Sequence, residues 1–142
     1  MITVDKIMSR RVLDVDMDVT VSEVREIFRH AHFHHILVKD GERLVGIVSD
    51  RDLLKAVSPF VGSGDERPRD LATLNKRVHQ IMTRKPITIC VDGSVLAAIR
   101  CFIEHGISCL PVVSKDGSVA GILTWRDILV AIAATAGHPN PN

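Results

Sequence analysis

The feature that most constrains this sequence is a short segment that occurs twice. Gly46–Asp52 reads GIVSDRD and Gly121–Asp127 reads GILTWRD. In each copy an apolar run ends at a hydroxyl residue, and an aspartate follows three positions later. This spacing is typical of a helix N-terminus, because the hydroxyl and the carboxylate can accept hydrogen bonds from backbone N–H groups of the first turn. Each segment therefore predicts a strand that runs directly into a capped helix.

The similarity between the copies extends to most of the chain. DKIMS at residues 5–9 aligns with HQIMT at residues 79–83, and the later segments keep the same order. We therefore expect one repeat over residues 1–57 and a second over 78–135. Residues 58–77, rich in Ser, Pro, Gly and charge, are predicted to form a linker with a helical end, and residues 136–142 a disordered tail.

Capping and turn signals give each repeat the same elements. Thr20–Glu23 is a capping box, Asp40-Gly41 and Asp116-Gly117 are hairpin turns, and Gly106 can end a helix. The predicted helices cover residues 3–8, 20–31, 50–57, 71–82, 94–105 and 125–135. The predicted strands cover residues 12–15, 34–38, 44–48, 87–89, 109–113 and 119–123. The fold class is α/β (α+β), with two pseudo-symmetric repeats, each a short sheet with helices on one face, and with the other sheet faces packed face to face.

Composition argues against several partners. The 18 Lys and Arg residues nearly balance the 17 Asp and Glu residues, so no net field attracts nucleic acid or an anionic membrane. No apolar run approaches the roughly 18 residues of a membrane span, and the expected location is cytoplasmic. Cys90, Cys101 and Cys109 lie in apolar segments without a C-x-x-C pair, so reduced core thiols are expected.

Catalysis and metal binding are both disfavoured. The sequence contains no nucleophile motif, no H-E-x-x-H and no phosphate-binding glycine loop, so we do not expect an enzyme. His30, His32, His34 and His35 form a cluster that could suggest a metal. A strand would send His34 and His35 to opposite faces, so we expect no metal site there. A metal-binding or catalytic protein that uses this cluster is the least favoured alternative.

Three motifs in fixed order resemble the CBS domain. They are IMS or IMT before the first strand, HGISCLPV at the second strand, and Gly, two apolar residues, Ser or Thr, two further residues and Asp at the third. A tandem pair of such domains is the Bateman module. The resemblance covers Val4 to about Val57 and Val78 to about Ala134, and is particularly close to small stand-alone bacterial CBS-pair proteins of the acetoin-utilisation type.

This resemblance implies two clefts between the repeats that bind an adenosine nucleotide (AMP, ADP or ATP) or S-adenosylmethionine. It assigns Asp52 and Asp127 to the ribose, and Ser49 and Thr124 to the phosphate or ribose. Arg51 and Arg126 could add a charge. The remaining cleft residues implied are Ser9, Val12, Leu13, Phe33 and His34 in the first repeat and Thr83, Ile87, Thr88, Ile107 and Ser108 in the second.

The two predicted clefts are unequal. Ser108 stands where the first repeat has His34, and Leu37 stands where the family usually has the proline seen at Pro111. We expect one cleft to prefer phosphorylated ligands and the other to bind more weakly or to take an uncharged adenosyl group. The first combines Ser9, Val12 and His34 with Thr124 and Asp127, and the second combines Thr83, Ile87 and Ser108 with Ser49 and Asp52.

The predicted function is a regulatory, ligand-sensing module that rearranges on binding and signals to an unidentified protein partner. We also expect a homodimer, because the helices and residues such as Val57, Phe60 and Val61 expose apolar surface. The alternative is a structural dimerisation module with empty clefts, in which the aspartates act only as helix caps. Trp125 could stack on a base or cover the core.

Overall fold

A computed structural model of the chain describes residues 2–136. The chain divides into two compact units. We call Leu13–Pro86 the central unit, and Met1–Val12 together with Ile87–Asn142 the terminal unit. The six residues of the predicted disordered tail after Ala136 lie outside the described part.

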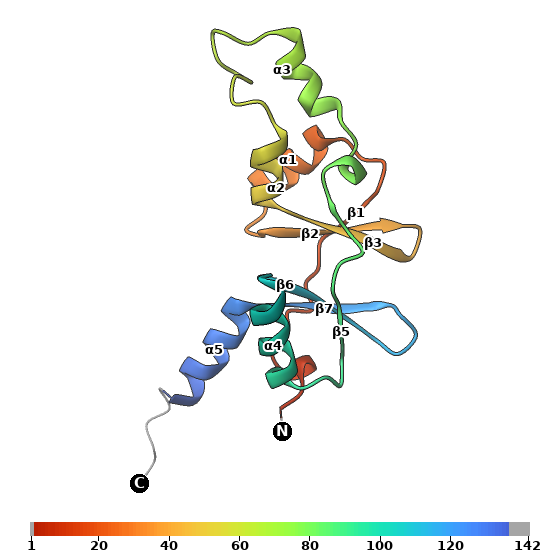
Figure 1. Cartoon of the computed structure of the whole chain (residues 1–142), viewed down its shortest axis with the longest axis vertical. Coiled ribbons are helices and arrows are strands. Elements are labelled where there is room, and N and C mark those ends of the chain that lie inside the picture. Colours follow the sequence, from red (N-terminus) through yellow and green to blue (C-terminus); the bar gives the residue numbers. More distant parts are fainter. Residues whose placement is uncertain (1, 137–142) are drawn as a thin grey trace. The chain divides into compact units, whose positions relative to one another are not determined.

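The central unit is built on a four-stranded sheet of order β1-β2-β3-β4. Strand β1 is parallel to β2, and β2 forms an antiparallel hairpin with β3, which pairs with β4. Helices α1 and α2 cover the same side of this sheet (Figure 1). The elements are β1 (Asp14–Asp16), α1 (Val21–His30), β2 (His35–Asp40), β3 (Arg43–Ser49), α2 (Asp50–Ala56) and β4 (Thr83–Arg84). The buried core comprises Val21, Val24, Ile36, Val38, Val48, Leu53 and Val78.

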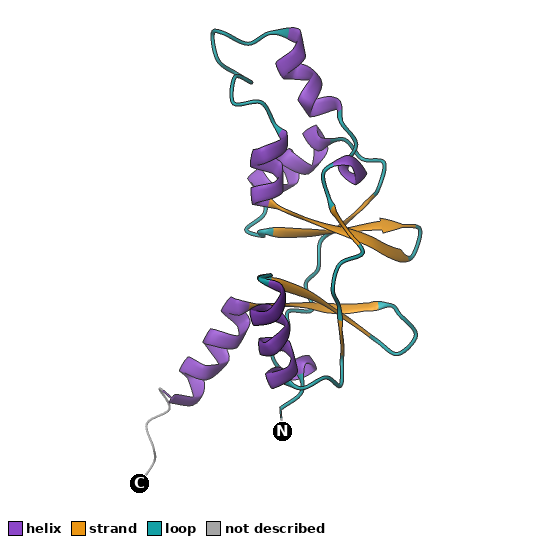
Figure 2. Ribbon diagram, viewed as in Figure 1, coloured by secondary structure: helices purple, strands orange, loops and turns teal. Residues whose placement is uncertain are grey.

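The terminal unit repeats this plan with a three-stranded sheet of order β5-β6-β7. Helix α4 connects the parallel strands β5 and β6, and α5 follows β7 directly (Figure 2). The elements are η1 (Val4–Lys6), β5 (Ile89–Cys90), α4 (Val95–His105), β6 (Cys109–Val113), β7 (Val119–Thr124) and α5 (Trp125–Ala136). The buried core comprises Val4, Ala98, Phe102, Leu110, Val112, Leu123 and Ile128. The predicted mixed fold of two similar α/β repeats is thus confirmed.

Local signals in the sequence located most helix ends and turns correctly. The Thr20 hydroxyl accepts from the backbone N–H of Glu23 at 3.2 Å, and the Glu23 carboxylate accepts from the N–H of Thr20 at 3.1 Å, so the capping box is confirmed. Gly106 follows α4 with φ of 62°. A side chain is strained in this left-handed region, which explains the helix end at a glycine.

The single helix predicted for residues 71–82 is wrong. The chain instead forms α3 (Pro68–Ala72) and two short 3-10 turns, η2 (Thr73–Asn75) and η3 (Val78–Gln80). The helix is interrupted because Lys76 and Arg77 run extended beside residues 19–21. There the Lys76 carbonyl accepts from the Val21 N–H, and the Val78 N–H donates to the Val19 carbonyl, each at 2.8 Å.

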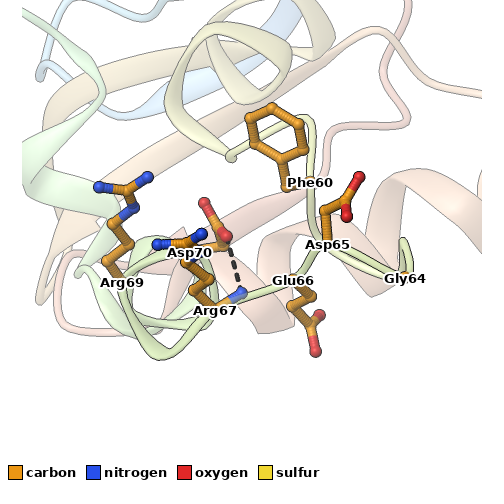
Figure 3. A pocket seen from close by; sticks show the side chains of 7 residues that line it. All are labelled: Phe60, Gly64, Asp65, Glu66, Arg67, Arg69 and Asp70. Carbon is orange, nitrogen blue, oxygen red and sulfur yellow. Dashed lines mark hydrogen bonds between the residues drawn. The ribbon is translucent and has the colours of Figure 1, made fainter.

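The linker is closed by a small polar network around a buried aspartate. The Ser58 hydroxyl donates to Asp70 at 2.7 Å. The backbone N–H of Arg67 donates to the same carboxylate at 2.8 Å, the bond drawn as a dashed line in Figure 3. These two donors hold the pKa of Asp70 below its usual range. The Ser58 N–H also donates to the Thr73 hydroxyl at 3.1 Å, so the two ends of the linker are joined.

Each repeat contributes its first segment to the other repeat's unit. Residues 2–12, which begin the first repeat, lie in the terminal unit, where Val4 is fully buried. Residues 78–86, which begin the second repeat, lie in the central unit, where Val78 is fully buried. We call these two stretches the exchanged segments. The compact units therefore cut across the repeats at 1–57 and 78–135 that the sequence indicates.

The glycines of the repeated motif let the exchanged segments approach the third strand. Ser9 and Ile122 exchange two backbone hydrogen bonds of 2.9 Å, and Gly121 lies beside them. A Cβ at Gly121 would lie 2.6 Å from the Ser9 carbonyl oxygen. A Cβ at Gly46 would collide with the Met82 side chain and lie 3.0 Å from the Thr83 carbonyl oxygen. Only glycine allows this close backbone contact.

We predict that Gly121→Ala lowers the free energy of unfolding by about 1 to 3 kcal/mol, because a backbone carbonyl must move. Gly46→Ala should cost less, because the flexible Met82 side chain can move aside. Urea unfolding of the full chain measures both changes. Gly64→Ala is the matched control, since a Cβ there has open space. An effect of Gly121→Ala no larger than that of the control would show that the close contact is not needed.

Candidate functional site

The two strand-to-helix junctions have nearly identical hydrogen bonding. At the central junction, Ser49–Asp52, the Asp52 N–H donates to the Ser49 hydroxyl at 3.1 Å, and the Ser49 N–H donates to Asp52 Oδ2 at 2.8 Å. At the terminal junction, Thr124–Asp127, the corresponding distances are 3.3 and 2.9 Å. The capping role foreseen for both aspartates is therefore real.

Capping leaves part of each carboxylate available. Both caps use Oδ2, and within residues 2–136 no hydrogen bond engages Oδ1 of Asp52 or Asp127. A carboxylate oxygen has two lone pairs, so the Oδ1 atoms can accept hydroxyl groups while the caps stay intact. Helix capping and ligand binding by the same aspartate are thus compatible, although the sequence presented them as alternatives.

The hairpin register gathers further predicted residues at each junction. The first strand of each hairpin begins opposite the hydroxyl residue, with His35 paired to Ser49 and Cys109 to Thr124. As a result, the Asp50 N–H donates to the His34 carbonyl at 3.0 Å, and the Trp125 N–H donates to the Ser108 carbonyl at 3.4 Å. His34 therefore belongs to the central junction, and Ser108 belongs to the terminal junction.

The exchanged segments bring one hydroxyl residue to each junction strand. Thr83 pairs with Ile47 on β3, and Ser9 forms a bridge with Ile122 on β7. Hairpin pairing also places His34 beside Ser49 and Asp50 within the central unit. The division of the predicted residues between two clefts stays a prediction. The central set is Thr83, His34, Ser49 and Asp52, and the terminal set is Ser9, Ser108, Thr124 and Asp127.

The other predicted residues divide between the same two units. Arg51 and Arg126 are exposed, and in the described part of the chain neither forms an ion pair. Ile87 packs against the terminal core. The central unit also holds Leu13 and Phe33, and the terminal unit also holds Val12, Thr88 and Ile107.

Trp125 occupies a defined position at the terminal junction. Its indole N–H donates to the Ile107 carbonyl at 3.0 Å, and 55% of the residue is exposed. The side chain therefore does not simply cover the core, which was one of the two roles considered for it. Its fixed, accessible ring keeps the other role, stacking on a base, open.

The central junction has a histidine–aspartate contact that the terminal junction lacks. His34 Nδ1 lies 2.8 Å from Asp50 Oδ2, an interaction that the sequence did not predict although Asp50 directly follows the motif's Ser49. Trp125 takes the place of Asp50 at the terminal junction. Burial lowers the pKa of the neighbouring His35, and His34 lowers it further, while Asp50 and Asp52 oppose the shift. In the terminal unit, burial and Asp127 raise the pKa of Cys109, so this thiol stays neutral.

Leu37, which stands where the second repeat has Pro111, also affects the structure. The Leu37 N–H donates to the Leu13 carbonyl at 2.9 Å. Pro111 has no N–H, so the terminal unit cannot form the corresponding bond. Strand β5 accordingly begins at Ile89, beyond the position that matches Leu13.

The structure also bears on metals and membranes. Among residues 2–136, no group of three or more His, Cys, Asp or Glu side chains is positioned to hold a metal ion. Within the same residues, no helix has both the length and the hydrophobicity needed to cross a bilayer.

The sequence matches the CBS domain family over residues 4–59 and 78–134. The chain therefore belongs to this family, and the recognition of a tandem pair is confirmed. It is 30% identical over 130 residues to a CBS domain-containing protein of Dictyostelium discoideum, covering 90% of this chain and 89% of that one. It is 32% identical over 126 residues to a homoserine O-acetyltransferase of Methanosphaera stadtmanae, but spans only 23% of that enzyme.

Solved structures of CBS pairs share the fold. The CBS domain pair of protein MJ0100, in complex with 5′-methylthioadenosine and S-adenosyl-L-methionine, is 26% identical, with a TM-score of 0.78, covering 95% of this chain and 98% of that one. CBSX2 in complex with AMP is 28% identical, with the same TM-score, covering 96% and 99%. AcuB from Vibrio cholerae, described as an acetoin utilization protein, is 24% identical with a TM-score of 0.76, covering 96% and 94%, a likeness of fold.

We predict that the chain loses stability as the pH falls below 6.5, the ordinary pKa of histidine. Because the pKa of His35 is lowered by folding, the unfolded chain takes up a proton that the folded chain resists. Above 6.5 both states are neutral and this contribution to stability is complete. It is lost as the pH falls from 6.5 toward the folded-state pKa.

The free energy of unfolding, measured in urea between about pH 8 and pH 5, tests this linkage. His35→Gln should reduce the change of the free energy of unfolding with pH in that range. His32→Gln, at an exposed position, should leave this pH dependence unchanged. An unchanged slope in His35→Gln would assign the pH dependence to other groups.

Proposed function

We propose that this protein is a regulatory, non-enzymatic module that binds an adenosine-containing ligand at its strand-to-helix junctions. The ligand would be AMP, ADP, ATP or S-adenosylmethionine, and binding would alter the arrangement of the chain for a protein partner. The observation that carries the proposal is the pair of junction aspartates, each with one oxygen capping a helix and the other without a hydrogen bond to any of residues 2–136. A carboxylate oriented in this way is suited to accept ribose hydroxyls.

Two further observations support the proposal. The helix N-termini at both junctions favour negative groups such as phosphate. Two CBS pairs of similar structure are complexes, one with AMP and the other with S-adenosyl-L-methionine and 5′-methylthioadenosine. The match to the acetyltransferase covers under a quarter of that enzyme, so it carries no catalytic residues into the proposal. The cytoplasmic location stays a prediction. The alternative, a structural module without ligand, differs in one measurable respect, since it would bind no nucleotide.

We predict that Asp52→Asn and Asp127→Asn weaken ligand binding with little loss of stability. Asparagine keeps an acceptor for the helix cap but loses the charge that strengthens hydrogen bonds to hydroxyl groups. Loss of these bonds should cost about 2 to 3 kcal/mol in binding, a roughly 30- to 150-fold weaker affinity. Calorimetric titration with AMP, ATP and S-adenosylmethionine measures the affinity, and thermal unfolding without ligand measures the stability.

Asp65→Asn, an exposed position in the linker, is the control for a general charge effect. If both junction variants bound the ligands with wild-type affinity, the aspartates would act only as helix caps and not as ligand-binding residues. No binding of any of the three ligands to the wild-type chain would favour the structural alternative.

We also predict that the two junctions differ in ligand preference. His34, with its Asp50 partner, can donate to a phosphate, whereas the equivalent Ser108 carries no charge. His34→Ala should therefore weaken ATP binding more than S-adenosylmethionine binding, by about 1 kcal/mol or roughly fivefold. Ser108→Ala is the matched control at the other junction. Equal effects of His34→Ala on both ligands would remove His34 from phosphate recognition.

A further inference from the structure

The linker of the central unit folds around a pocket, which we call the linker pocket. Its volume is about 410 Å³, within the roughly 300 to 1,000 Å³ that is typical of small-ligand sites. It is lined by Phe60, Gly64, Asp65, Glu66, Arg67, Arg69 and Asp70 (Figure 3). None of these residues belongs to a strand-to-helix junction, so the linker pocket is separate from the candidate adenosine site.

Hydrogen bonds within the linker hold two of the three carboxylates of the pocket. Asp70 is only 6% exposed and accepts from the Ser58 hydroxyl and the Arg67 N–H. Glu66 accepts from the backbone N–H of Gly62 at 2.9 Å. In Figure 3 the Glu66 side chain points away from the ring of Phe60. Both carboxylates therefore serve the conformation of the linker itself.

The positive groups of the linker pocket have no such partner. Arg67 and Arg69 are exposed, and within residues 2–136 no ion pair engages either guanidinium group. A guanidinium group carries five N–H donors and can hold a carboxylate by two parallel hydrogen bonds. Two such groups in one pocket are thus available to a negatively charged group of a ligand.

An unengaged carboxylate and an aromatic ring complete the linker pocket. In the described part of the chain, the Asp65 side chain has neither a hydrogen bond nor an ion pair. Figure 3 shows the guanidinium groups of Arg67 and Arg69 on one side of Phe60 and the Asp65 carboxylate on the other. Phe60 is 49% exposed, so its ring is accessible between the opposite charges.

The position of Phe60 differs in character from what the sequence indicated. Phe60 was expected to share an exposed apolar surface with Val57 and Val61. It lines a pocket in which every other side chain is charged, since Gly64 has none. Val57 and Val61 are only partly exposed. The homodimer expected from that surface stays a prediction.

The balance of charge in the linker pocket favours a zwitterion over a simple anion. The lining has three carboxylates and two guanidinium groups, so it is negative by one charge. A phosphate or a dicarboxylate would bring further negative charge to this lining. A molecule with one carboxylate and one ammonium group is neutral and can place each charge next to the opposite one.

We propose that the linker pocket binds a free amino acid with a large apolar side chain. Arg67 and Arg69 bind its α-carboxylate, and Asp65 binds its α-ammonium group. Phe60 packs against its side chain. The chain then responds to an amino acid at the linker as well as to an adenosine-containing ligand at the junctions, and the two sites share no residue.

The test is calorimetric titration of the full chain with L-phenylalanine and two analogues. Hydrocinnamate lacks the ammonium group, and phenethylamine lacks the carboxylate. L-Phenylalanine should bind at one site per chain, and each analogue should bind at least about tenfold more weakly, because it leaves a charge of the pocket unpaired. Binding of hydrocinnamate as tight as that of L-phenylalanine would overturn the assignment of a zwitterion. No saturable binding of L-phenylalanine or L-leucine at millimolar concentration would overturn the site.

Variants of the lining assign the binding to this pocket. Arg67→Gln, Arg69→Gln and Asp65→Asn should each weaken L-phenylalanine binding by about tenfold. Arg100→Gln, at an exposed position on α4, is the matched control. Thermal unfolding without ligand should be unchanged, because none of the three replaced side chains is held by an ion pair.

Losses no larger than that of the Arg100→Gln control would overturn the proposal. The titration contains no nucleotide, and titration of the same chain with AMP is a separate measurement. Failure of the linker pocket can therefore be told apart from failure of the proposed function.

Discussion

The contact on which both units depend is the backbone approach between an exchanged segment and the third strand of a repeat. Ser9 and Ile122 form two hydrogen bonds in the terminal unit, and β4 pairs with β3 in the central unit. Glycine at positions 46 and 121 makes this approach possible, since a Cβ would meet Met82 in one unit and Ser9 in the other. The same contacts carry Val4 and Val78 into the two cores.

This contact also connects the fold to the candidate site. The exchanged segment pairs with the strand that ends at Ser49 in the central unit and at Thr124 in the terminal unit. The same strand therefore bonds to the exchanged segment along its edge and supplies the helix cap at its last residue. The cap then fixes the carboxylate by one oxygen and leaves the other without a hydrogen bond to residues 2–136. A ligand group that bound there would meet an acceptor whose orientation is already set, which lowers the entropy cost of binding.

Much of this could be predicted from the sequence, for identifiable reasons. The capping box at Thr20, the hairpins and the helix end at Gly106 depend on residues within a few positions, and these were located correctly. The failure at residues 71–82 arose because the extended conformation there depends on partners near Val19, almost 60 residues away. The hydrogen bond from the Asp50 N–H to the His34 carbonyl was not predicted for a related reason, since it depends on the strand register. The Asp50 partner of His34 was missed because a first-turn aspartate is common at helix ends.

The exchange of segments has a consequence for how such a chain can be divided. A fragment that ended in the linker would keep the sheet of β1, β2 and β3 but would lack β4 and Val78, and its own first segment would have no strand to pair with. One repeat is therefore a unit of sequence without being a unit of folding. Two such fragments could complete each other only by exchanging segments between molecules, as in a domain-swapped dimer. In the tandem chain the same exchange takes place within one molecule, because the two repeats are covalently joined.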